Sequence, residues 1–140
     1  MARLEFRPGA VRNFAQSRAL KSVRETTAAV NRGATRRAPG GLYSTGRLKN
    51  SITWSVQAAG SNVRGRSGSE LEYAIYPERG TRPHRITPRQ APHLRFYWRK
   101  RGVWFKGPAV NHPGQQAQNF MTDALQEIAP RYGYKVIIYG

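Results

Sequence analysis

The stretch YAIYPERGTRPHRI, residues 73–86, decides the fold that this sequence predicts. Side chains alternate in character over residues 71–76, which predicts a β-strand with a period of two. Pro77 ends the pairing of that strand, Gly80 can adopt a positive φ, and Pro83 fixes the backbone again. The sequence therefore predicts a strand that runs into a rigid, positively charged loop.

A long amphipathic helix is predicted upstream, over residues 11–38. Apolar side chains recur there at steps of three and four residues, and basic side chains occupy the other face. Gly33 weakens this helix by about 1 kcal/mol relative to alanine, which allows a kink at that position. Pro39 ends the helix, because the residue before a proline is disfavoured in the α region.

Three short elements are predicted around this helix and the loop. Thr45 can cap a single helical turn that buries Leu48, and an alternating strand follows over residues 52–58 with its even-numbered side chains half-buried. Residues 60–69 are polar and rich in glycine and arginine, so they predict a projecting hairpin loop. Residues 1–10 form an N-terminal arm with a short edge strand.

The C-terminal half predicts a hairpin, a helix and a last strand. Residues 77–92 form a second projecting loop, and alternating aromatic residues then predict a hairpin over residues 94–106 with a cationic turn. The apolar residues of that hairpin are predicted to be core. An apolar stripe predicts a helix over residues 117–128, and residues 134–140 predict a strand inside a sheet or against another subunit.

The assembled prediction is an α+β fold in a single domain, residues 1–140. Both helices pack on one side of a mainly antiparallel sheet of four or five strands, with basic loops projecting from it. A chain of this length buries one core.

Charge is the strongest compositional signal. Lys and Arg number 24 against seven acids, giving a net charge of +17, so the chain requires a polyanion or an acidic protein surface nearby. No cysteine, membrane-length apolar run or signal-peptide core is present, and we expect a soluble protein made in the host cytoplasm, with no membrane partner.

Catalytic and metal sites are not predicted. No carboxylate occurs in residues 26–69 or 79–122, and only Glu70, Glu72 and Glu78 approach a group. The histidines have no metal-ligand spacing to one another. We therefore expect a protein without enzymatic activity and without a cofactor. The histidines are His84, His93 and His112.

Basic residues interleaved with aromatic ones are the best candidate for function. Nine Lys or Arg lie between Arg79 and Lys106, a composition that suits phosphate contact with some stacking. A solvated face, or salt bridges to an acidic neighbouring protein, explains the same charge equally well. The candidate charges are Arg64, Arg66, Arg95, Arg99, Lys100, Arg101 and Lys106.

Three motifs in order, APGGLYSTGRLKNSI, YAIYPERGTRPHRI and VNHPGQQAQNFMTDAL, resemble the neck or tail-completion proteins of long-tailed bacteriophages, also labelled head-to-tail joining or minor tail components. The motif positions matched are Pro39, Thr45, Gly46, Leu48, Ser51, Ile52, Tyr73, Ala74, Tyr76, Glu78, Gly80, Thr81, His112, Pro113, Gly114 and Phe120. Arg82 and Pro83 belong to the same loop, which we interpret as a subunit contact, with Glu78 tethering Arg79 or Arg82.

The resemblance implies a structural subunit of the virion neck. Such a subunit forms a ring, of six copies in the expected case, between the portal-side stopper or connector and the tail-terminator or tail-tube proteins, around the channel that the genome crosses. Non-specific contact with genomic DNA is then expected of the positive charge. The alternative is a free, non-specific nucleic-acid-binding protein.

Overall fold

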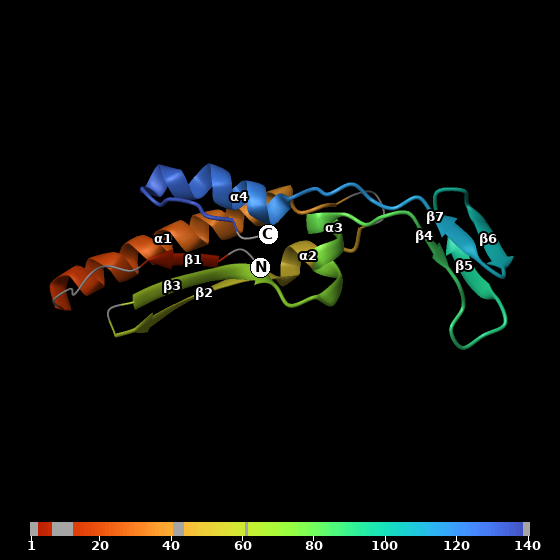
Figure 1. Ribbon diagram of the computed structural model, residues 1–140, viewed down its shortest axis with the longest axis horizontal. Coiled ribbons are helices and arrows are strands. Elements are labelled where there is room, and N and C mark those ends of the chain that lie inside the picture. The colour runs from red at the N-terminus through yellow and green to blue at the C-terminus, as the bar shows by residue number, and fades with distance from the viewer. Residues whose placement is uncertain (1–2, 7–12, 41–43, 61, 139–140) are drawn as a thin grey trace.

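The computed structural model describes residues 3–6, 13–40, 44–60 and 62–138. Most of its elements form an elongated body, and the rest extend from that body as an arm (Figure 1). The body elements are β1 (Arg3–Phe6), α1 (Asn13–Arg37), α2 (Arg47–Ser51), β2 (Ile52–Ala59), β3 (Asn62–Ser69), the 3₁₀ turn η1 (Glu72–Ala74), α3 (Ile75–Arg79), α4 (Phe120–Ile128) and the 3₁₀ turn η2 (Ala129–Tyr132). The arm, residues 81–118, carries β4 (His84–Ile86), β5 (Leu94–Trp98), β6 (Val103–Gly107) and β7 (Val110–His112).

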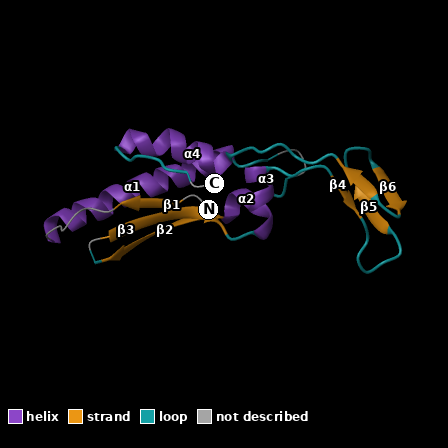
Figure 2. Ribbon diagram, viewed as in Figure 1, coloured by secondary structure: helices purple, strands orange, loops and turns teal. Residues whose placement is uncertain are grey.

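The predicted α+β class is confirmed, with the strands divided among small antiparallel sheets. The described strands form a three-stranded sheet in the order β1-β3-β2 and two two-stranded sheets, β4-β7 and β5-β6. The body is layered, with α1 between the three-stranded sheet and α4 (Figure 2). Because the arm holds two of the sheets, the body has three strands where a single sheet of four or five was expected.

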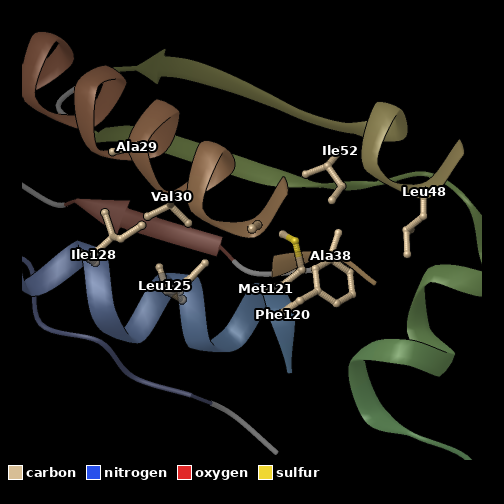
Figure 3. Close-up of a cluster of buried hydrophobic side chains, with 12 residues drawn as sticks. Ala29, Val30, Ala38, Leu48, Ile52, Phe120, Met121, Leu125 and Ile128 are labelled. Atoms are coloured by element: carbon tan, nitrogen blue, oxygen red, sulfur yellow. The ribbon is translucent and has the colours of Figure 1, made fainter. Parts of the chain in front are cut away.

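Helix α1 is buried along two faces, and this shapes its sequence. Ala19 and Val23 pack against Val63 of the sheet, while Val30 and Ala34 belong to the larger cluster shared with α4 (Figure 3). Buried threonines are tolerated because each hydroxyl donates to a carbonyl four residues earlier, at 2.6 Å in the case of Thr27 and Val23.

Gly33 lies at the crossing of the two long helices. The predicted helix is confirmed, and it continues through Gly33 without interruption to Arg37. A Cβ added at Gly33 would overlap Cδ1 of Ile128 and would lie 3.4 Å from Cβ of Ala124. The glycine therefore allows α4 to approach α1 closely, and its cost to helix propensity is offset by this packing.

The prediction of a projecting loop at residues 60–69 is wrong. Asn62–Ser69 is β3, the central strand of the body sheet, paired with β1 on one side and β2 on the other. Val63, Gly65 and Ser67 are buried against α1, and Ser67 Oγ donates to Asn31 Oδ1 at 2.9 Å. The small residues that resembled a loop are needed because the helix lies so close to this strand.

Strand β2 is confirmed, although its even-numbered side chains are covered unequally. Ile52 is buried and Val56 is half-buried, whereas Trp54 and Ala58 are exposed. The helical turn before it is also confirmed, with Leu48 buried in the core. Its N-cap is Gly46, with a φ of 73°, and Thr45 Oγ1 accepts from the Arg47 amide at 3.4 Å.

The predicted strand at residues 71–76 is wrong. The chain there is helical, as η1 and then α3, and Pro77 lies inside α3 rather than ending a strand. Because only six residues alternate, a period of two could not be separated from a period of 3.6. A strand would have placed Tyr73 and Ile75 together on its core face, as we expected from the alternation, but both are exposed.

The prediction of a terminal strand holds at the N-terminus and fails at the C-terminus. Strand β1 is confirmed, and it pairs with β3 from Arg3 opposite Arg66 to Phe6 opposite Val63. Residues 7–10 of the expected N-terminal segment lie outside the described residues. Residues 134–138 form no strand, so that prediction is wrong for them, and residues 139–140 lie outside the description. The Tyr134 and Ser22 hydroxyl groups form a hydrogen bond of 2.7 Å, which holds the segment against α1.

No described helix is long and apolar enough to span a membrane.

Replacing Gly65 by alanine should lower the free energy of unfolding by about 2 kcal/mol, because the new methyl group overlaps the side chain of Thr27. Urea denaturation of Gly65→Ala, Thr27→Ala and the double variant checks this. The double variant should be less destabilised than the sum of the single variants. An increase in stability for Gly65→Ala would show that β3 does not require this close approach.

Candidate functional site

The root of the arm is built by two glycines that interlock two chain segments. Thr81 and Gln115 exchange both backbone hydrogen bonds, at 2.8 and 2.9 Å. Gly80 has a φ of 73°, and a Cβ there would lie 2.5 Å from the Gln115 carbonyl oxygen. Gly114 has a φ of 84°, and a Cβ there would overlap the Thr81 carbonyl oxygen. Side chains are excluded at both positions by space and by backbone conformation.

Glu78 joins the root of the arm to the start of α4. Its carboxylate accepts hydrogen bonds from the amides of Met121 and Thr122, at 2.9 and 3.0 Å, and from the Thr122 hydroxyl at 2.6 Å. A carboxylate in this place satisfies free amides in the first turn and interacts favourably with the helix dipole. The predicted tether from Glu78 to Arg79 or Arg82 is therefore wrong, because the carboxylate is used on α4.

The two histidines of the motifs stack across β4 and β7. His84 is paired with His112 in register, and their ring centroids are 5.0 Å apart. Each ring is also held by the backbone, since His84 Nδ1 lies 2.9 Å from the Arg82 carbonyl oxygen and His112 Nδ1 accepts from the Gly114 amide at 3.1 Å. Within the described part of the chain, no group of three or more His, Cys, Asp and Glu could hold a metal ion.

The end of the arm is the hairpin of β5 and β6, whose turn is confirmed at residues 99–102. One face carries the apolar side chains, and the other carries cations beside aromatic rings, because neighbouring positions alternate. The apolar face consists of Leu94, Phe96, Trp98, Val103 and Phe105; the second face consists of Arg95, Tyr97, Trp104 and Lys106. Apart from Gly107, no residue of the hairpin is buried.

The aromatic residues of the hairpin are therefore not core, contrary to prediction. Trp104 is 67% exposed and Val103 is 51% exposed. Their contacts are with one another: Phe96 and Phe105 have ring centroids 5.2 Å apart, and Tyr97 and Trp104 are 5.7 Å apart. Sequence alternation identified the faces correctly, but within the described part of the chain the aromatic side chains are left exposed or half-buried.

Guanidinium groups lie over two rings of the hairpin, the half-buried Trp98 and the exposed Trp104. Arg101 lies 4.4 Å from the centroid of Trp98, and Arg95 lies 5.4 Å from that of Trp104. Such pairs hold the charge and the ring together at the surface. The hairpin therefore presents an apolar face, a face of cations and rings, and a cationic turn that contains Lys100.

The predicted charges fall into two groups. Arg95, Arg99, Lys100, Arg101 and Lys106 are together on the hairpin, whereas Arg64 and Arg66 lie on β3 in the body, at alternate positions to its buried residues. Arg64 and Arg99 each take part in an interaction within the chain. The structure therefore does not bring all seven charges into one surface.

Several motif residues pack in the core of the body or support it. Leu48 and Phe120 are buried in the same core cluster, and Ser51 donates to the Leu48 carbonyl at 2.7 Å and bonds to the Ser69 hydroxyl at 2.7 Å. Pro39 follows the last buried residue of the helical segment. Tyr73, by contrast, is exposed on η1. The surface that the sequence missed is this exposed face of η1 and α3, which a helical period would have identified.

Residues 11–80 match a family model described as "Bacteriophage HK97-gp10, putative tail-component". The chain belongs to the HK97-gp10-like family. It is a structural component associated with the phage tail, and its partners are other proteins of the virion. The family match ends at Gly80, where the arm begins, so the hairpin lies outside the matched residues. Neither the curated proteins nor the solved structures gave a significant match.

Replacing Glu78 by alanine should lower the free energy of unfolding by about 2 kcal/mol, because three donors at the start of α4 lose their acceptor. Thermal or urea denaturation measures the loss. Glu25→Ala is the matched control, since its 4.0 Å ion pair with Lys21 is exposed and contributes little. Equal, small losses in the two variants would contradict the role assigned to Glu78.

Proposed function

We propose that this tail component is a neck subunit, which forms a ring joining the head connector or stopper to the tail tube around the DNA channel. The observation that carries the proposal is the hairpin, which extends from the body (Figure 1) with no residue buried apart from Gly107. An isolated two-stranded hairpin is marginally stable in water and gains stability by packing on another surface. A ring supplies that surface, because each subunit meets a neighbour in the same orientation.

Body and arm act as one domain, residues 1–140, in this proposal. Glu78 and the interlocked glycines Gly80 and Gly114 fix the root, so the arm can present the hairpin in a defined direction. Subunit contact then depends on the shape of the root, which directs the hairpin, and not on a direct charge contact. The motif residues that contribute to this shape are Thr81, Arg82, Pro83 and Pro113.

Charge supports a position at the DNA channel. The net charge is +17, and several acids have internal roles, since Glu78 caps α4 and Glu127 pairs with both Arg37 and Arg131. A lumen crossed by DNA tolerates such a surplus, and so does contact with acidic connector or tail proteins. The ring is expected to contain six subunits, and no catalysis is required of it.

The double variant Lys100→Ala/Arg101→Ala should reduce the yield of tail-joined, DNA-filled particles by about tenfold, the effect of losing about 1.4 kcal/mol at one contact. Electron micrographs of phage complemented with each variant measure this, and wild-type particles should show a symmetric ring at the neck. Arg24→Ala/Arg32→Ala removes two exposed charges from α1 and serves as control. Normal joining and DNA retention in the hairpin variant would contradict a role for the cationic turn.

A free nucleic-acid-binding protein is the second candidate, favoured by the cation–ring pairs Arg101–Trp98 and Arg95–Trp104 on the hairpin. Cations beside exposed rings suit phosphate contact and base stacking.

A salt titration with a short DNA duplex separates the two candidates. The neck proposal predicts weak binding with a shallow dependence on salt, because few phosphates meet the hairpin of a single subunit. A slope of magnitude about 5 or more would mean that the free chain neutralises about six phosphates, and would favour the second candidate. The hairpin variant Lys100→Ala/Arg101→Ala should change the slope by no more than about 2.

A further inference from the structure

The body carries an exposed surface in which acids and apolar side chains occur together. Residues of η1 and α3 follow a helical period: Ala74, Pro77 and Glu78 are turned away from solvent, and the positions between them are exposed. The exposed surface, here called the acidic-apolar face, consists of Glu70, Glu72, Tyr73, Ile75 and Tyr76. Tyr76 is 55% exposed and Ile75 is 47% exposed.

The acids of this face are available for a partner. Within the described part of the chain, neither Glu70 nor Glu72 forms an ion pair or a side-chain hydrogen bond, whereas Glu78 caps α4 and Glu127 pairs with two arginines. Two exposed carboxylates so close together are unusual in a chain with seven acids and 24 basic residues. Their position beside three exposed apolar side chains makes the face suitable for a partner that is both cationic and apolar.

The hairpin has the complementary character. Lys100 and Arg101 lie in its turn, and Val103, on the apolar face of the hairpin, follows at the start of β6. Along the chain, the acids of the face come before its apolar residues, and the cations of the hairpin come before its apolar residue. In one orientation of the hairpin, therefore, cations meet acids while apolar side chains meet apolar side chains. Arg79, at the other end of α3, would repel the cationic turn in the reversed orientation.

We propose that the hairpin turn of one subunit docks on the acidic-apolar face of a second copy of this chain. Lys100 and Arg101 meet Glu70 and Glu72, and Val103, on the apolar face of the hairpin, covers Ile75 and Tyr76. The contact is between subunits because the hairpin lies at the end of the arm, away from α3 of its own chain (Figure 1). Two different surfaces meet, so the contact is heterologous and generates a ring when it closes. The inference rests on the ring of the proposed function and identifies the contact that builds it.

Disulfide cross-linking tests this contact, since the chain contains no cysteine of its own. Tyr76→Cys and Val103→Cys each place one thiol on an exposed position. When the two purified variants are mixed and oxidised, the mixed disulfide should form at least about tenfold faster than between Val103→Cys and Lys21→Cys, a control thiol on the exposed face of α1, because docking raises the effective thiol concentration. Equal rates would overturn the proposal in solution.

Tailed particles provide the second measurement. Particles assembled with the double variant Tyr76→Cys/Val103→Cys should give a ladder of disulfide-linked multimers on a non-reducing gel. Particles that contain the protein but give no ladder overturn the contact while leaving the neck role intact. Particles that lack the protein overturn the neck role, and in that case the rates measured in solution decide the contact.

Charge exchange supplies an independent check in the same mixture. Glu70→Lys/Glu72→Lys added to the Tyr76→Cys chain, or Lys100→Glu/Arg101→Glu added to the Val103→Cys chain, should each lower the cross-linking rate several-fold. Combining both changes should restore most of it, because the pairs of opposite charge are formed again. Restoration would not occur if the substitutions acted by unfolding either surface, and its absence would count against the pairing proposed here.

Discussion

Helix α1 is packed on two sides, and the rest of the body depends on this constraint. The sheet reaches it through β3, and α4 reaches it through a crossing at Gly33, so both approaches require residues without bulky side chains. Gly65 meets the first requirement and Gly33 the second. With two of its faces buried, the helix carries its basic residues on the remaining exposed surface, at Arg18, Lys21, Arg24, Arg32 and Arg36, and the arm carries a second large share of the surplus.

The parts of the fold that follow from long periodic patterns could be predicted from the sequence. Twenty-five residues of α1, the apolar stripe of α4 and the aromatic alternation of the β5–β6 hairpin each determine their own element type. Strand β3 could not be predicted, because its glycines and serines reflect the proximity of a helix that the local sequence does not reveal. The strand predicted over residues 71–76 was wrong for a different reason. So short a segment fits both a period of two and a period of 3.6, and the local sequence does not decide between them.

The candidate site was predicted in composition but not in arrangement. Basic residues 95–106 were identified from their density, and the structure places them together on one hairpin. Exposure of the aromatic residues beside them could not be predicted, because alternation shows that two faces differ and not whether anything covers them. The histidine-proline-glycine motif gave no sign that Gly114 would interlock with Thr81, a contact between residues far apart in the chain.

The interlocked root has a thermodynamic consequence for assembly. A flexible arm would lose conformational entropy when it joined a neighbour, and that loss would subtract from the affinity of every contact around a ring. Here the segments that lead to and from the hairpin are already paired at Thr81 and Gln115, and at Gly80 and Gly114 the two backbones approach too closely to admit a side chain. In the proposed ring, the arm of the free subunit would therefore already hold its assembled conformation, and this preorganisation would allow a small interface to be sufficient.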